Sequence, residues 1–276
     1  MGKRRSTEEL RALAKAIRND ILDMTFQAGI NGAHIGGAMS SADILAVLYG
    51  EVLRVSPDNL ADPSRDRFLL SKGHVALALY AVLAECGFIS RDEMMSFEGP
   101  GSDFPTHAVM NLGKGIEISS GSLGWGLSIG VGCALAAKRA GADYHTFVLL
   151  GDGECNEGSV WEAAMSAVRF GLDNLTVIVD ANGQQLDGYS ADVMPLHDIP
   201  GIFRGFGFFV EEADGHDMEQ LYSALHTTAA GIPTAVVAHT VKGKGIREIE
   251  GKTGWQHTTL TQEQYEIFAE SLKGDQ

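Results

Sequence analysis

Apolar residues in this chain occur in two patterns, one with helical spacing and one of short continuous runs. The helical spacing is clearest from Thr7 to about Ala28 and predicts a long helix with one apolar face. Further helices are expected near Ala42–Val52, over Val75–Glu85 and over Leu127–Lys138. Capping boxes predict helix starts at four places: Ser6–Glu9, Ser90–Glu93, Asp217–Gln220 and Thr261–Gln264.

The continuous apolar runs predict short buried strands between these helices. The runs are Phe68–Leu70, Ile116–Ser119, Thr146–Leu150, Leu175–Asp180, Phe206–Glu211 and Thr234–Thr240. Alternation of strands and helices favours an α/β fold with a doubly wound, mostly parallel sheet covered by helices on both faces. Glycine-rich segments at Gly32–Gly37 and Gly99–Gly126 are expected to be loops that line a site. No repeat or linker divides the chain, so we expect residues 1–276 to form a single domain.

Composition and charge narrow the possible partners. Hydrophobic residues make up 45% of the chain and charged residues 21%, with a net charge of −15, which argues against a nucleic-acid partner. Cys86, Cys133 and Cys155 form no paired motif, and we expect Cys155 to be a buried structural thiol. No run reaches the roughly 18 apolar residues of a membrane span. The start Met1–Ser6 formally fits a myristoylation signal, but Ser6 fits a helix cap better, so a cytoplasmic location is expected.

The chemistry is concentrated where two predicted strands end. Gly151-Asp152-Gly153 follows one strand and Asn182 follows the next. The carboxyl ends of parallel strands meet at one edge of a sheet, where open α/β sheets bind ligands. Glycine N–H groups suit a phosphate, and Asp and Asn oxygens suit Mg²⁺, which predicts a diphosphate bound through a metal. Taken alone, the tripeptide also fits a strand-to-helix turn with Asp152 as a helix cap.

Two other nucleotide-binding motifs do not fit. The glycines at 151, 153 and 158 are too widely spaced for a dinucleotide fingerprint, and an acid separates the first two. Gly251-Lys252-Thr253 resembles the end of a P-loop, but Ile246 stands where the earlier glycine is required.

Further motifs occur in a fixed order along nearly the whole chain. They are Gly32–Gly37, Arg65–Phe68 with Ser71–His74, Phe104–His107, Gly115–Glu117 with Gly121–Gly126, Asp214–Asp217 and Lys242–Gly245. Together with the Gly-Asp-Gly and Asn elements, they make the chain similar to the N-terminal, diphosphate-binding half of a transketolase. The resemblance implies thiamine diphosphate as cofactor and Mg²⁺ as metal, with Ca²⁺ or Mn²⁺ possible.

The resemblance also implies roles for individual residues. Asp152 and Asn182 would bind the metal through side-chain oxygens and Gln184 through its backbone carbonyl, while Gly153 would donate its N–H to a phosphate. The remaining cofactor contacts implied are His74 at the diphosphate, Gly121 and Leu123 at the aminopyrimidine, and Leu186 at the thiazolium. For Leu123 and Leu186, simple core packing remains the alternative.

Histidines are expected to bind the substrate and to transfer its protons. The resemblance places His34 and His107 near the first carbon and neighbouring hydroxyls of a sugar, where imidazole can act as acid, base or donor. His257 would join them, although Trp255-Gln256-His257 departs by one residue from the Trp-His-Gly order common in the family. The histidines without such context are expected to be structural: His145, His197, His226 and His239.

The implied activity is transfer of a two-carbon ketol unit from a ketose to an aldose, with sugar or sugar-phosphate substrates. In the family, the carboxylate that acts on the aminopyrimidine lies in a second domain, so a separate pyrimidine-binding subunit is expected, assembled with this chain as a heterotetramer. Glu157 would then face the subunit interface. Two alternatives stay open: a thiamine-dependent acyl transferase acting on a pyruvate-type donor or a carrier-bound acceptor, and a non-catalytic paralogue.

Overall fold

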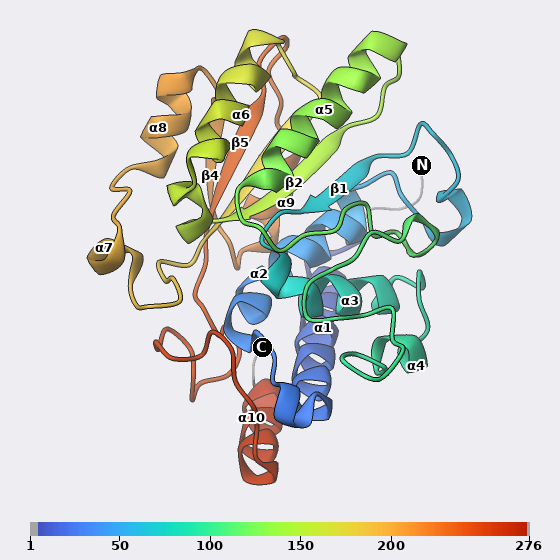
Figure 1. Cartoon of the computed structure of the whole chain (residues 1–276), viewed down its shortest axis with the longest axis vertical. Helices are drawn as coiled ribbons and strands as arrows, with labels where there is room; N and C mark the ends of the chain where they lie inside the picture. Colours follow the sequence, from blue (N-terminus) through green and yellow to red (C-terminus); the bar gives the residue numbers. More distant parts are fainter. Residues whose placement is uncertain (1–4, 275–276) are drawn as a thin grey trace.

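A five-stranded sheet, in which every strand is parallel to its neighbours, forms the centre of the molecule (Figure 1). The computed structural model describes residues 5–274. The strand order is β1-β2-β3-β5-β4. The strands are β1 Arg67–Leu70, β2 Thr146–Gly151, β3 Leu175–Ala181, β4 Phe209–Asp214 and β5 Thr234–His239.

Helices cover both faces of this sheet, as the sequence predicts. On one face lie α1 (Thr7–Gln27), α2 (Ile35–Val47), α3 (Ala76–Glu85) and α9 (Met218–His226), and α10 (Gln262–Gly274) packs against α1. The other face packs on α5 (Trp125–Ala140), α6 (Gly158–Arg169) and α8 (Ile199–Phe206) (Figure 1). Two short helices, α4 (Arg91–Met94) and α7 (Ser190–Val193), lie in the connecting segments. Residues along β2 alternate between the two cores, so the strand is buried on both faces and reads as a continuous apolar run.

Three of the four predicted capping boxes are present. Ser6 with Glu9, Ser90 with Glu93 and Thr261 with Gln264 each exchange hydrogen bonds between side chains and backbone. The fourth prediction is wrong in part. Asp217 does cap α9, but the Gln220 side-chain oxygen accepts a hydrogen bond from Asp214 N–H and not from the backbone N–H of Asp217.

Two predicted strands differ from the structure. The prediction Phe206–Glu211 is shifted: α8 continues through Phe206, and β4 begins only at Phe209. Gly207 ends that helix with a φ of +103°, a left-handed conformation that glycine adopts without strain. The predicted strand Ile116–Ser119 is absent, since Ile116 makes only an isolated bridge to Asn111 within the long loop.

The Gly32–Gly37 segment is a loop only as far as His34. Helix α2 begins at Ile35, earlier than the expected Ala42, and continues into a π-helical turn at Leu48–Val52. A Cβ on Gly36 would lie 2.5 Å from the carbonyl oxygen of Trp255. This glycine therefore permits close packing inside a helix, where the sequence pattern suggests a loop.

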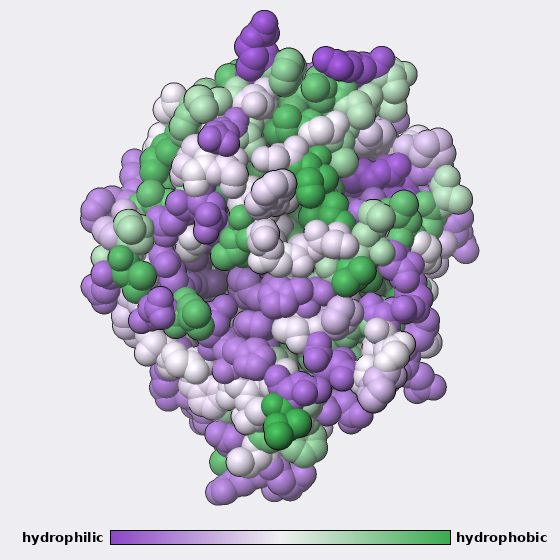
Figure 2. Space-filling model, viewed as in Figure 1, coloured by the Kyte–Doolittle hydropathy of each residue, from purple (hydrophilic) through white to green (hydrophobic). Residues whose placement is uncertain are grey.

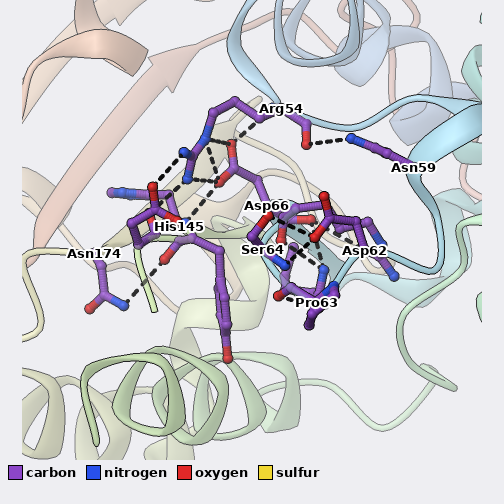
Figure 3. A network of polar contacts seen from close by, with 12 residues as sticks. Arg54, Asn59, Asp62, Pro63, Ser64, Asp66, His145 and Asn174 are labelled. Atoms are coloured by element: carbon purple, nitrogen blue, oxygen red, sulfur yellow. Dashed lines mark hydrogen bonds and ion pairs between the residues drawn. The ribbon is translucent and has the colours of Figure 1, made fainter. Parts of the chain in front are cut away.

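A polar network ties the amino-terminal ends of β1 and β2 together, at the edge opposite the one where ligands are expected (Figure 3). Arg54 pairs with Asp66, and Asp66 Oδ1 accepts a hydrogen bond from His145 N–H at 2.8 Å. The His145 ring lies 2.8 Å from Thr176 Oγ1. His145 is thus part of the framework and far from the predicted site, which agrees with its structural assignment.

Within residues 5–274, no helix combines the length and apolar character needed to cross a membrane. Cys155 is fully buried, and burial raises the pKa of its thiol well above the ordinary value. This confirms the expectation of a structural thiol.

Candidate functional site

A cavity of about 550 Å³ opens at the carboxyl ends of the strands. Ten of the residues expected to bind the cofactor, the metal or the substrate line it: His34, His74, His107, Gly121, Leu123, Asp152, Gly153, Asn182, Gln184 and Leu186. Parallel register brings them together, because Gly151 at the end of β2 pairs with Asp180 near the end of β3. Asp152 is the first residue after β2, and Asn182 is the first residue after β3.

Asp152 and Asn182 form the oxygen-rich side of the cavity. Asp152 Oδ2 accepts hydrogen bonds from Gly183 N–H at 2.9 Å and from Ser190 Oγ at 3.0 Å. Burial and the neighbouring charge of Asp180 raise the pKa of Asp152, and a divalent cation would offset both effects. Asn182 turns its Nδ2 toward Asp180, 3.2 Å away, and its Oδ1 accepts a hydrogen bond from Gln184 N–H at 3.1 Å. A carboxylate and an amide oxygen at one edge are donors that fit Mg²⁺.

Beneath this oxygen-rich side, the carboxylate of Asp180 accepts hydrogen bonds from three other segments of the chain. It is fully buried and forms an ion pair with Lys72, which is also buried. Ser40 Oγ and Thr240 Oγ1 donate to its two carboxylate oxygens. Burial alone would raise the pKa of Asp180, but the Lys72 charge and these hydrogen bonds outweigh it and hold the pKa below its ordinary value.

Glu154 fixes the glycine-rich loop at another wall of the cavity. Its Oε1 accepts from Gly124 N–H at 2.8 Å and from Ser71 Oγ at 2.5 Å, and its Oε2 accepts from Gly151 N–H at 3.1 Å. Gly124 has a φ of +83°, and a Cβ there would collide with Ser159 and Glu157. Glu154 therefore joins the loop that carries Gly121 and Leu123 to the end of β2.

Three histidine rings surround the ring of His34. Ring centroids lie 5.5 Å from His34 for His74, 5.6 Å for His107 and 4.7 Å for His257. Burial lowers the pKa of His34 to about 4, with help from the neighbouring His257, His107 and Lys242. Burial, followed by the charge of Lys72, lowers the pKa of His74 to about 3. Both rings are therefore neutral near pH 7 and can donate from one nitrogen while accepting at the other.

His257 lies at the edge of this cluster, although it is not among the residues that line the cavity. Ala33 and Thr258 form an antiparallel bridge through two backbone hydrogen bonds of 2.8 and 3.0 Å, which brings the His257 ring against His34. Gly32, at a φ of +66°, leaves room for this, because a Cβ there would lie 2.8 Å from the His257 ring. The residue before it, Gln256, does line the cavity.

Lys242 adds a buried positive charge to the same cavity. Its Nζ donates to Gln256 Oε1 and lies 3.5 Å from the carbonyl oxygen of Gln185. Burial, followed by the charge of Lys72, lowers the pKa of Lys242 to about 8. An anion in the cavity would stabilise the charged form of this amine.

Apolar side chains surround the mouth of the cavity. Leu186 and Met194 line it and are 69% and 59% exposed, far more than residues of a completed core. Gly121 is shared with a neighbouring groove that contains Trp125, which is 65% exposed, and Ile129. Figure 2 shows hydrophobic residues over α5 and beside α7, on the same face of the molecule. Glu157 is exposed at the cavity mouth.

Several lining residues received no role from the sequence: Lys72, Glu154, Lys242, Gln185 and Gln256. Lys72 and Lys242 belong to motifs already noted, and a lysine beside a glycine-rich phosphate motif is a signal that could have identified them. Asp180 could have been suspected as an acid at the end of a strand with no exposed face. Its partners lie far away along the chain, and the sequence does not reveal them.

Comparison with known proteins identifies the family. Residues 10–272 match the family model described as transketolase, thiamine diphosphate binding domain. The chain therefore belongs to the transketolase family, in the part that binds thiamine diphosphate.

The relatives are of two kinds: chains named as transketolase subunits, which this chain covers almost fully, and longer transketolases, which it covers in part. The chain is 38% identical to one of the subunits of the apulose-4-phosphate transketolase of Actinobacillus succinogenes, with 98% of each chain covered. It is 36% identical to the 6-deoxy-6-sulfo-D-fructose transketolase subunit SqwG of Clostridium sp., with 96% of each covered. It is also 36% identical to human transketolase, but spans only 42% of that protein.

Solved structures agree with the fold. The chain superposes on the transketolase of Campylobacter jejuni with a TM-score of 0.87 and 30% identity, covering 100% of this chain and 44% of that one. This confirms the predicted α/β fold and the resemblance to the N-terminal part of a transketolase.

Proposed function

We propose that this chain is one subunit of a two-subunit, thiamine-diphosphate-dependent transketolase that moves a two-carbon ketol unit from a ketose to an aldose. The observation that carries the proposal is the cavity at the strand ends, which joins Asp152 and Asn182 to the histidine cluster around His34. When bound, the cofactor would supply a nucleophilic carbon that stabilises the transferred unit.

The oxygen-rich side of the cavity would hold the metal and the diphosphate. Asp152, Asn182 and the carbonyl of Gln184 would hold Mg²⁺, or Ca²⁺ or Mn²⁺ in its place, and the metal would tie the diphosphate to the protein. Gly153 N–H and His74 contact the phosphates. The Lys242 ammonium neutralises part of their charge, which its position in the cavity supports.

The opposite wall would hold the rings of the cofactor. Gly121 and Leu123 offer backbone groups to the aminopyrimidine, because Glu154 fixes their loop. The exposed side chain of Leu186 packs on the thiazolium, whose binding would cover it.

The histidines would bind the sugar and move its protons. His34 and His107 contact the first carbon and the neighbouring hydroxyls, and His257 assists from the edge of the cluster. A neutral imidazole can take a proton at one nitrogen, and His34 Nδ1 is buried without a partner among the described residues. Several such groups suit a polyhydroxylated substrate, a sugar or sugar phosphate.

A separate pyrimidine-binding subunit would complete the site. Two observations support this partner: the apolar rim formed by Leu186, Met194 and Trp125, and the near-full coverage of relatives named as transketolase subunits. An apolar rim beside a binding cavity is typical of a subunit interface. We propose a heterotetramer of two subunits of each kind around a two-fold axis, with Glu157 at the interface.

The test is a two-carbon transfer assay on the purified chain, alone and with the pyrimidine-binding half of a transketolase from the same genome. A panel of ketoses, ketose phosphates and pyruvate serves as donors. Transfer from a ketose is expected only when both chains, thiamine diphosphate and Mg²⁺ are present.

Each alternative gives a different result in this assay. Robust transfer by the chain alone would exclude the split enzyme. Activity on pyruvate but on no ketose would favour the acyl transferase, and a stable complex that binds no cofactor would favour a non-catalytic paralogue.

A further inference from the structure

His216, in the loop after β4, has both ring nitrogens engaged although it lies outside the cofactor cavity. Nδ1 is 2.6 Å from Asp43 Oδ2, and Nε2 is 2.9 Å from the backbone nitrogen of Val241. A backbone N–H can only donate, so Nε2 must be the unprotonated, accepting nitrogen. The ring proton is then on Nδ1 and is donated to Asp43. This hydrogen-bond pattern assigns a neutral ring with one fixed tautomer.

Asp43 is held firmly at the other end of this contact. It lies on α2, is buried, and accepts hydrogen bonds from both terminal nitrogens of Arg18, which lies on α1, at 3.2 and 2.5 Å. Burial would raise the pKa of Asp43, but Arg18 and His216 outweigh it and keep the pKa below its ordinary value. The carboxylate therefore stays ionised and keeps accepting the Nδ1 proton, as carboxylates do when they orient a histidine.

Val241 is the residue immediately before Lys242. Strand β5 ends at His239, so the chain here is held by hydrogen bonds outside the sheet. Thr240 Oγ1 donates to Asp180, and Gly243 N–H donates to the carbonyl of Gly36 at 2.9 Å. The Val241 N–H bond to His216 lies between these two contacts. Lys242 itself is 3% exposed and lines the cavity, so a small change in this turn would move its ammonium group.

We propose that His216 is a positioning residue for Lys242, acting as the acceptor that fixes the Val241 N–H and thereby the turn that carries the ammonium into the cavity. The inference rests on the proposed function, in which Lys242 contacts the cofactor diphosphate. It assigns a role to the Asp214–Asp217 motif, which the transfer chemistry itself does not use.

Two substitutions distinguish the hydrogen bond of His216 to Val241 from its hydrogen bond to Asp43. In His216→Gln, the side-chain oxygen reaches the place of Nε2 and can still accept from Val241, while the contact to Asp43 is lost. In His216→Asn, the shorter amide can donate to Asp43 from the place of Nδ1 but cannot reach Val241. His226→Asn is the matched control, since that histidine is exposed at the end of α9, where its Nδ1 lies 2.9 Å from the Tyr222 carbonyl oxygen.

Two readouts are measured for each variant: hydrogen exchange of the Val241 amide in the single chain, and thiamine diphosphate affinity of the assembled enzyme by calorimetry. His216→Asn should speed Val241 exchange and weaken cofactor binding about tenfold, the size of one lost hydrogen bond. His216→Gln and His226→Asn should remain within about threefold of the unmodified protein in both readouts.

Equal impairment of the Gln and Asn variants, or unchanged Val241 exchange in His216→Asn, would overturn the proposal. If His216→Asn does not fold, the Gln variant decides alone: retained binding supports the acceptor role and lost binding contradicts it. If the unmodified assembled enzyme binds no thiamine diphosphate, the proposed function fails. The exchange comparison then still decides whether His216 holds Val241.

Discussion

Lys72 and Asp180 form an ion pair that is almost completely withdrawn from solvent, with side-chain exposures of 1% and 0%. The pair lies beneath the proposed metal ligands and links β1 to the end of β3. Removing one partner of a buried pair leaves an uncompensated charge, which costs far more than an exposed pair contributes.

Asp180→Asn should therefore lower the free energy of unfolding by about 3 kcal/mol, measured by urea denaturation. Glu270→Gln breaks the exposed pair between Glu270 and Lys273 and is the control, with an expected loss below about 1 kcal/mol. Similar small losses in both variants would show that the buried charge of Lys72 is compensated by some other group.

Asp152→Ala should abolish Mg²⁺-dependent binding of thiamine diphosphate in the assembled enzyme while the chain stays folded. The change removes the only carboxylate among the three proposed metal ligands, so the diphosphate loses its bridge to the protein. Calorimetric titration measures the affinity, and circular dichroism monitors the fold.

Asp187→Ala is the control for this experiment, since Asp187 is an exposed carboxylate in the neighbouring loop. It should bind the cofactor as the unmodified protein does. If Asp152→Ala binds thiamine diphosphate with unchanged affinity, the proposed metal site is wrong.

The central strands could be predicted because burial on both faces makes them continuous apolar runs. Thr146–Leu150 differs by a single residue from β2, whereas Phe206–Glu211 fails because Gly207 ends a helix in the middle of an apolar stretch. Both segments look alike in sequence. Packing against Trp161, whose ring stacks on Phe206, belongs to the tertiary structure and favours the helix there.

The residues of the site were easier to predict than the contacts between them. Motifs pointed to Asp152, Asn182 and four histidines, whereas the partner of Lys72 lies 108 residues away along the chain. Long-range hydrogen bonds of this kind leave no local pattern. The bridge between Ala33 and Thr258, which brings His257 to His34, escapes sequence analysis for the same reason.

His34→Ala and His107→Ala should each lower ketose turnover in the assembled enzyme by roughly 100-fold, as expected for loss of a positioned acid or base. Affinity for thiamine diphosphate should change little, because neither side chain is proposed to contact the diphosphate. Steady-state kinetics give the turnover, and calorimetry gives the affinity. His226→Ala, on the surface of α9, should leave both unchanged. If either variant retains full turnover, the role assigned to that histidine is wrong.

His145 should contribute one titration of its own to the pH dependence of stability, beside those of His34 and His74. Burial lowers its pKa to about 4, with Asp66 opposing and Arg54 adding to the shift, whereas the ordinary value is 6.5. Between these two values the unfolded chain binds a proton that the folded chain excludes. The stabilisation from the neutral ring is therefore complete above pH 6.5 and is lost as the pH falls toward 4.

The measurement is urea denaturation of the unmodified chain and of His145→Gln at a series of pH values in this window. Below the ordinary pKa, the free energy of unfolding should rise with pH more steeply in the unmodified chain, by up to about 1.4 kcal/mol per pH unit. Thr176→Val removes the ring's hydrogen-bond partner but keeps the imidazole. It should lower stability by about 1 kcal/mol and preserve the slope. Equal slopes in the unmodified chain and His145→Gln would mean that the ring is protonated in the folded state, contrary to its burial beside Phe147.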